Sequence, residues 1–170
     1  MSPGESIAVG VVGIACVFDL HTRRIPNTLT LGAAAAALIA AGAAGGVAGL
    51  TSSLSGWLLA TALWIPIYAL GGMGAGDVKL LAAVGAWLGP ADAFHAAMYA
   101  GIAGAIMALS LAVSRGLLRQ TVSNLQLLVV HWQVMGFTPH AQLTLANTDR
   151  PRLAYALPIL AGTVVAIWLR

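Results

Sequence analysis

The sequence predicts an all-α polytopic membrane protein with about six transmembrane helices and one cytoplasmic amphipathic helix. Of its 170 residues, 59% are hydrophobic and only 8% are charged, and the mean hydropathy is +0.90. A soluble domain of this length does not need so much apolar sequence. The apolar residues also fall into separate segments, several of which approach the roughly 20 residues that cross a bilayer as a helix. We therefore expect residues 1–170 to form a single domain embedded in the lipid bilayer.

Residues that end helices or turn the chain divide the first three predicted spans. The polar, basic loop 21–26 follows the first span, and Asn27 or Thr28 is a suitable N-cap for the second. Two glycines at 45–46 and the Thr-Ser-Ser segment 51–53 predict the turn between the second and third spans. The six predicted spans cover residues 6–18, 28–44, 54–70, 78–88, 91–113 and 153–169.

The fourth predicted span, 78–88, is short. As a helix it would cover about 16 Å, roughly half of the hydrocarbon thickness of about 30 Å. Either the residues before it lie in a wet cavity below the membrane surface, or the bilayer thins there. A Gly-Pro pair at 89–90 ends this span, and Asp92 is expected to be the N-cap of the next one.

The segment 115–152 differs in composition and is expected to be a cytoplasmic insertion made of an amphipathic helix and a loop. In its first part, apolar residues recur at three- and four-residue spacing, with polar residues mostly on the other face, which is typical of a helix at the membrane surface. The second part, 136–152, is polar, contains two prolines and predicts a loop. The apolar face comprises Leu117, Leu118, Val122, Leu125, Leu128, Val129 and Trp132.

The basic residues predict the orientation of the chain in the membrane. With six spans, seven of the eight basic residues fall on one side and only Arg170 falls on the other. That side is expected to be the cytoplasm, so both termini face outward. Asp19 and Asp77 then lie at the same, cytoplasmic, ends of their helices. The seven residues are Arg23, Arg24, Lys79, Arg115, Arg119, Arg150 and Arg152.

Two of the five acidic residues stand at the ends of apolar segments, where a carboxylate is costly to bury and usually has a function. Asp19 ends the first segment, and Asp77 follows the glycine-rich stretch 71–76. Two carboxylates that share one proton can hydrolyse a peptide, because one takes a proton from water while the other protonates the carbonyl oxygen. The alternative is that both aspartates only cap helix ends beside the neighbouring basic residues.

The composition gives no support to metal, cofactor or nucleic-acid binding. The four histidines show no ligand spacing and Cys16 is the only cysteine, so we expect no metal site, no cofactor and no intrachain disulfide bond. The formal net charge is +3 and the few basic residues fall at segment ends, which argues against nucleic acid as a partner.

Two sequence blocks resemble a known family. The segment 72–81, Gly-Met-Gly-Ala-Gly-Asp-Val-Lys-Leu-Leu, contains Gly-x-Gly-Asp and is similar to the signature of type IV prepilin peptidases. The segment 18–27, Phe-Asp-Leu-His-Thr-Arg-Arg-Ile-Pro-Asn, resembles the other block of that family, an aspartate followed by basic residues and Ile-Pro-Asn. Both blocks occur in order at matching helix ends, and the resemblance covers roughly residues 5–113.

This resemblance implies an aspartic endopeptidase of the bacterial inner membrane. Such enzymes remove the leader peptide from prepilins and pseudopilins at the cytoplasmic face, and Asp19 and Asp77 match their catalytic aspartates. The short chain is similar to the peptidases of tight-adherence (Flp-type) pilus systems. Larger members also methylate the new N-terminus, an activity expected to be absent here because the chain begins almost at the first span and has one cysteine.

Five further residues are expected to bind the substrate. Gly74 and Gly76 carry no side chain, so the backbone of an extended substrate can come close to the neighbouring aspartate. Arg23 and Arg24 are positive-inside anchors that would also attract an acidic residue of the leader, and Lys79 is an anchor or tunes the carboxylates electrostatically.

The competing hypothesis is a non-enzymatic polytopic subunit or a small transporter of a secretion or pilus system. A transporter predicts broken helices at corresponding positions of two repeats. The sequence has one glycine-rich break, at 71–76, and no second half that resembles the first.

Overall fold

The computed structural model describes residues 1–139 and 153–169, and these residues form six α-helices and no β-strand. The prediction of an all-α fold is confirmed. Helices α1, α2 and α4 are long and apolar enough to cross a membrane, and α6 is a shorter apolar helix. The helices are α1 (Pro3–Thr22), α2 (Asn27–Ala69), α3 (Ala75–Leu88), α4 (Pro90–Ser114), α5 (Leu118–Met135) and α6 (Ala156–Trp168).

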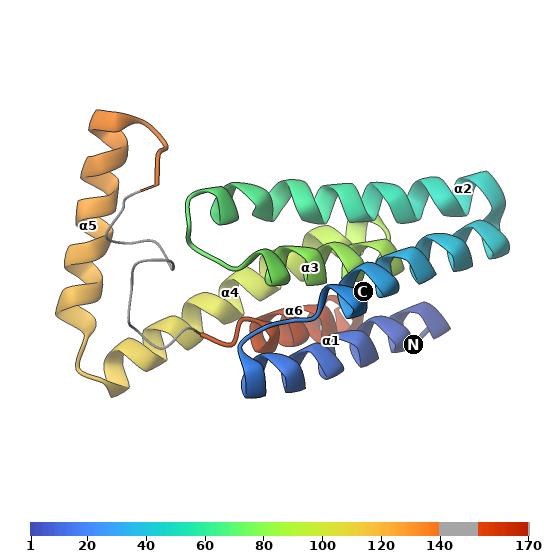
Figure 1. Cartoon of the computed structure of the whole chain (residues 1–170), viewed down its shortest axis with the longest axis horizontal. Coiled ribbons are helices and arrows are strands. Elements are labelled where there is room, and N and C mark those ends of the chain that lie inside the picture. Colours follow the sequence, from blue (N-terminus) through green and yellow to red (C-terminus); the bar gives the residue numbers. More distant parts are fainter. Residues whose placement is uncertain (140–152, 170) are drawn as a thin grey trace.

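Helix α2 is a helical hairpin, because Gly46 leaves the helical region of backbone space (φ 59°, ψ −140°). Figure 1 shows the second arm of α2 running back beside α3. The turn predicted at 45–46 is confirmed, but the prediction that 51–53 belong to it is wrong, since these residues are helical. Ser53 is buried there, and its hydroxyl donates a hydrogen bond to the carbonyl oxygen of Ala86 in α3 at 2.7 Å.

Both predicted N-caps are wrong, and a proline lies at the start of each helix. Proline favours the first positions of a helix because its φ is already fixed there and its missing N–H is not needed. Helix α2 has Pro26 as its N-cap, with no side-chain capping bond, and Asn27 is its first helical residue. Helix α4 begins at Pro90, so Gly89 becomes the N-cap and Asp92 lies buried in the first turn.

Helix α3 lies at the centre of the bundle. It packs against the second arm of α2 so closely that a Cβ added to Gly56 or to Gly85 would strike the backbone of the other helix. Small residues permit this kind of approach between helices. Eight of its 14 residues are buried, namely Val78, Leu80, Leu81, Ala82, Ala83, Val84, Gly85 and Ala86.

The two C-terminal helices behave differently. Helix α6 is shorter than the predicted span 153–169 and packs against α4, where a Cβ on Gly162 would contact the backbone nitrogen of Ala100. Helix α5 confirms the predicted helix in the insertion, has no buried residue, and crosses the end of the bundle (Figure 1). Most of the loop predicted at 136–152 lies outside the described residues.

Candidate active site

Asp19 lies in the last turn of α1, and its side chain is buried inside the bundle. Its Oδ2 accepts a hydrogen bond from the backbone N–H of Ala156, the first residue of α6, at 3.2 Å. Arg23 ends the helix in a left-handed conformation (φ 54°), and its N–H donates to the carbonyl oxygen of Asp19 at 3.0 Å. The end of α1 therefore holds a carboxylate that the start of α6 contacts directly.

Asp77 is the third residue of α3 and lies in its first turn. Its Oδ2 accepts a hydrogen bond from the backbone N–H of Gly74, the N-cap, at 3.2 Å. An acidic side chain at this position is favoured because the first N–H groups of a helix lack intrahelical partners. In the glycine-rich stretch 71–76, only Gly71 has a positive φ (76°). The chain thus turns at Gly71, and α3 begins earlier than the glycine pattern predicted.

Both aspartates line the same two cavities. The small cavity, of about 100 Å³, is also lined by Gly72, Met73 and Tyr155. The large cavity, of about 480 Å³, is bordered by the loop after α1 and by residues 74–77 at the start of α3. All seven residues predicted for the site line the large cavity: Asp19, Arg23, Arg24, Gly74, Gly76, Asp77 and Lys79.

The two sequence blocks contact each other beside the large cavity. The Lys79 ammonium donates a hydrogen bond to the side-chain oxygen of Asn27 at 2.9 Å. A Cβ added to Gly76 would lie only 3.3 Å from the Cβ of Ile25. The Ile-Pro-Asn segment therefore packs on the first turn of α3, and the absence of a side chain at Gly76 permits that contact.

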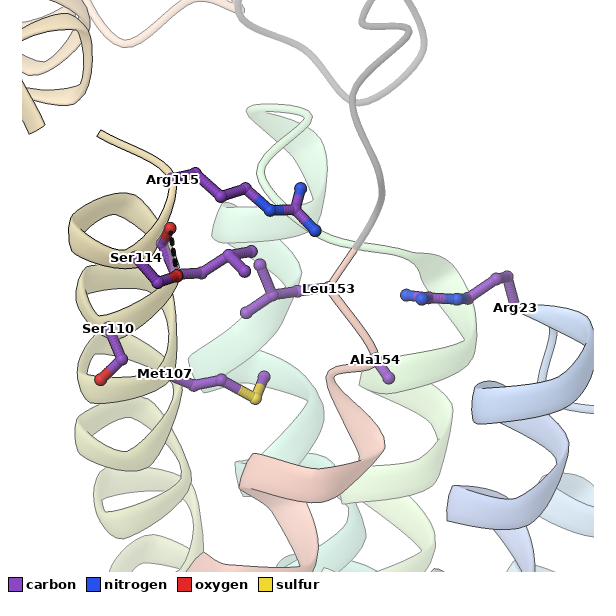
Figure 2. Close-up of a pocket in the computed structure, with 8 residues that line it drawn as sticks. Arg23, Met107, Ser110, Ser114, Arg115, Leu153 and Ala154 are labelled. Atoms are coloured by element: carbon purple, nitrogen blue, oxygen red, sulfur yellow. Dashed lines mark hydrogen bonds between the residues drawn. The ribbon is translucent and has the colours of Figure 1, made fainter. Parts of the chain in front are cut away.

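A third hollow, of about 460 Å³, adjoins the site between α4 and the segment that leads into α6. In Figure 2 the side chains of Arg115 and Arg23 point toward one another across Leu153 and Ala154. Leu153 also lines the small cavity, so the segment before α6 separates the two spaces.

Sequence reasoning missed the residues at the start of α6 and just before it. Tyr155 and Leu153 line the small cavity, and Ala156 bonds Asp19. No local signal marks these residues, because their contacts are with distant parts of the chain. Ala156 and Asp19, for example, are 137 positions apart. Within residues 1–139 and 153–169, no group of three or more His, Cys, Asp or Glu side chains could hold a metal ion.

The long apolar helices indicate a membrane protein. The sequence model of the type IV leader peptidase family matches residues 6–109, which is more than half of the chain. The chain therefore belongs to the type IV leader peptidase family, a family of proteases, and the resemblance noted in the sequence is confirmed. The match includes Asp19 and Asp77 and ends within α4. Searches of curated proteins and of solved structures found no match.

Proposed function

We propose that the chain is a membrane aspartic endopeptidase that removes the leader peptide from type IV, Flp-like prepilins and pseudopilins. The observation that carries this proposal is that Asp19 and Asp77 line the same two cavities. Each carboxylate is held through Oδ2 by one backbone N–H, and among the described residues neither Oδ1 accepts a hydrogen bond. In the proposed mechanism, the two Oδ1 atoms face a water molecule and a substrate carbonyl.

The chemistry follows from two carboxylates that share one proton. The ionised carboxylate takes a proton from water, and the protonated carboxyl group donates its proton to the carbonyl oxygen of the scissile peptide bond. The oxygen of the water attacks the carbonyl carbon and forms a tetrahedral intermediate. When the intermediate collapses and the C–N bond breaks, the leaving amine takes the proton that the first carboxylate removed from water, and the second carboxylate recovers its proton from the intermediate's hydroxyl group. Both aspartates are needed, because one group cannot be acid and base at the same step.

The large cavity is the proposed binding site of the substrate. Gly74 and Gly76 leave room there for an extended backbone beside Asp77. Arg23 and Arg24 border the same space and would attract an acidic residue of the substrate. Because this part of the wall is basic and the rest includes apolar residues, we infer that a segment combining an apolar stretch with a carboxylate binds here.

We further propose that the whole chain is one domain with six spans in the bacterial inner membrane. The spans are α1, the two arms of α2, α3, α4 and α6, with both termini outside. Figure 1 shows α5 at the end of the bundle where α1 ends and α3 begins, the end that carries both aspartates. A cytoplasmic position of this end agrees with the basic residues, since all five that the structure describes lie near it, namely Arg23, Arg24, Lys79, Arg115 and Arg119.

Reporter fusions test this orientation. Fusions after Arg24, Gly74 and Arg119 should report from the cytoplasm, because these positions lie at the end of the bundle where the basic residues gather. Fusions near Ser52 and Asp92 should report from outside. If fusions after Arg24 and Gly74 report from opposite sides, the two aspartates cannot share one site.

Co-expression with candidate Flp-like prepilins tests the activity itself. The prepilin should lose its leader only when this chain is present, as measured by the mass of its N-terminal peptide. Prepilins that all keep their leader, with the chain accumulating in the membrane, would favour a non-enzymatic subunit or transporter.

A further inference from the structure

The segment that leads into α6 lines the small cavity, although it lies outside the residues that the family match covers. The N–H of Ala156 donates to Oδ2 of Asp19, and the preceding residue, Tyr155, lines the small cavity beside both aspartates. The direction of the Asp19 carboxylate therefore depends on where the first turn of α6 is placed.

Tyr155 is partly buried and contacts two helices. Its ring meets the ring of Trp64 in α2 edge to face, with the centroids 5.4 Å apart and the planes at 75°. Such aromatic pairs prefer this geometry. On α4, a Cβ added to Gly104 would collide with the Tyr155 hydroxyl. The tyrosine thus fits a gap that Trp64 and Gly104 define, and no described residue forms a hydrogen bond with its hydroxyl in this structure.

The body of α6 is fixed against α4 as well. A Cβ on Gly162 would contact backbone atoms of Ala100, so the two helices approach each other with almost no side chain between them. With the helix axis fixed at Gly162 and the first turn fixed at Tyr155, the N–H of Ala156 has little freedom relative to Asp19.

We propose that Tyr155 is a positioning residue for the reaction: it seats the first turn of α6 so that the Ala156 N–H holds Oδ2 of Asp19 and turns Oδ1 toward the small cavity. This inference rests on the proposed peptidase activity. It assigns the role to the aromatic ring and its packing, and none to the hydroxyl. Loss of the ring should therefore misplace the Asp19 carboxylate without removing any group that reacts.

The first arm of the test compares two substitutions of Tyr155 in membranes that contain the full chain and a cleaved prepilin. Tyr155→Ala should lower kcat by about 10- to 100-fold, the cost of a misplacement of about 1 Å, while KM changes by less than about threefold. Tyr155→Phe should restore kcat to within about threefold of the original chain, because the ring still fits the gap. A loss in Tyr155→Phe as large as in Tyr155→Ala would overturn the proposal, since the hydroxyl would then take part.

The second arm displaces the tyrosine without changing it. Gly104→Ala should lower kcat, measured per molecule of membrane-extracted protein, because its Cβ collides with Tyr155. Gly101→Ala is the matched control in α4, since a Cβ there meets nothing within 4 Å. Equal kcat for the two variants would contradict the proposal.

A third measurement separates this inference from the proposed function. Asp77→Asn should abolish cleavage if the chain is an aspartic peptidase at all. If Asp77→Asn is inactive while Tyr155→Ala and Gly104→Ala keep the original kcat, the positioning role fails and the peptidase proposal stands. If Asp77→Asn retains full activity, the peptidase mechanism itself fails.

Discussion

Helices α3 and α5 are both rich in apolar residues, yet they have opposite surroundings. Eight of the 14 residues of α3 are buried among protein atoms, whereas none of the 18 residues of α5 is buried. Helix α3 carries Asp77 at its first turn, and α5 carries no acidic residue. The apolar side chains of α3 form part of a packed core that fixes a carboxylate, whereas those of α5 lie outside that core.

The difference shows that, in a membrane protein, the apolar composition of a helix does not tell how closely the helix packs against the rest of the protein. Lipid tails are as apolar as leucine, so an apolar side chain gains little by moving from lipid to protein. What holds α3 in place is close packing, as at the crossing of Gly56 and Gly85. Among the helices that the structure describes, α5 contacts only α4.

The largest expected effect concerns the crossing of α2 and α3. Gly56→Val should destabilise the bundle by about 3 kcal/mol or more, because the new side chain must push two contacting backbones apart. Thermal unfolding in detergent measures the change. Gly32→Val, in the same helix with open space around its Cβ, should cost far less. Equal losses of stability for the two variants would mean that the close packing of α2 on α3 does not hold α3 in place.

The next effect compares leucines in the two helices. Leu81→Ala in α3 should cost about 2 kcal/mol, the low end for a buried leucine, because the cavity remains while the transfer from lipid contributes little. Leu125→Ala in α5 should change stability by no more than about 0.5 kcal/mol, since its side chain is 58% exposed. A similar loss at Leu125 would show that α5 packs against protein after all.

A third prediction concerns the first turn of α3. Gly76→Val should reduce cleavage about tenfold or more, a change of about 1.4 kcal/mol or more in the barrier, because the added side chain crowds Ile25 in the wall of the large cavity. Ala75 lines the same cavity, and Ala75→Val should reduce cleavage less than Gly76→Val does. The measurement is the cleaved fraction of a co-expressed prepilin per molecule of enzyme. Normal cleavage by Gly76→Val would make this glycine a spacer only.

Local features of the fold could be predicted from the sequence because each depends on residues close together in the chain. Long apolar runs gave the helices, and two glycines at 45–46 gave the turn in α2, where Gly46 needs a positive φ. The prediction of a turn at the Thr-Ser-Ser segment 51–53 is wrong, because a hydroxyl group within a helix can form its hydrogen bond with a neighbouring helix. Ser53 does so with the carbonyl oxygen of Ala86.

Contacts between distant residues could not be predicted in this way. The two sequence blocks located the aspartates, and the structure places all seven predicted residues around one cavity. The part of the site built by α6 was missed, since neither the bond from Ala156 to Asp19 nor the fit of Tyr155 against Gly104 has a local pattern. Helix packing decides both.

Kinetics of three asparagine variants test the central claim most directly. Asp19→Asn and Asp77→Asn should each lower kcat for leader cleavage by about 100- to 10,000-fold, the range for loss of general acid–base catalysis, while the protein still accumulates in the membrane. Asp92→Asn is the matched control, because Asp92 is also a buried aspartate in a bundle helix but lines neither of the cavities that the two aspartates share. It should retain the original kcat per molecule. Full activity in either Asp19→Asn or Asp77→Asn would contradict the account.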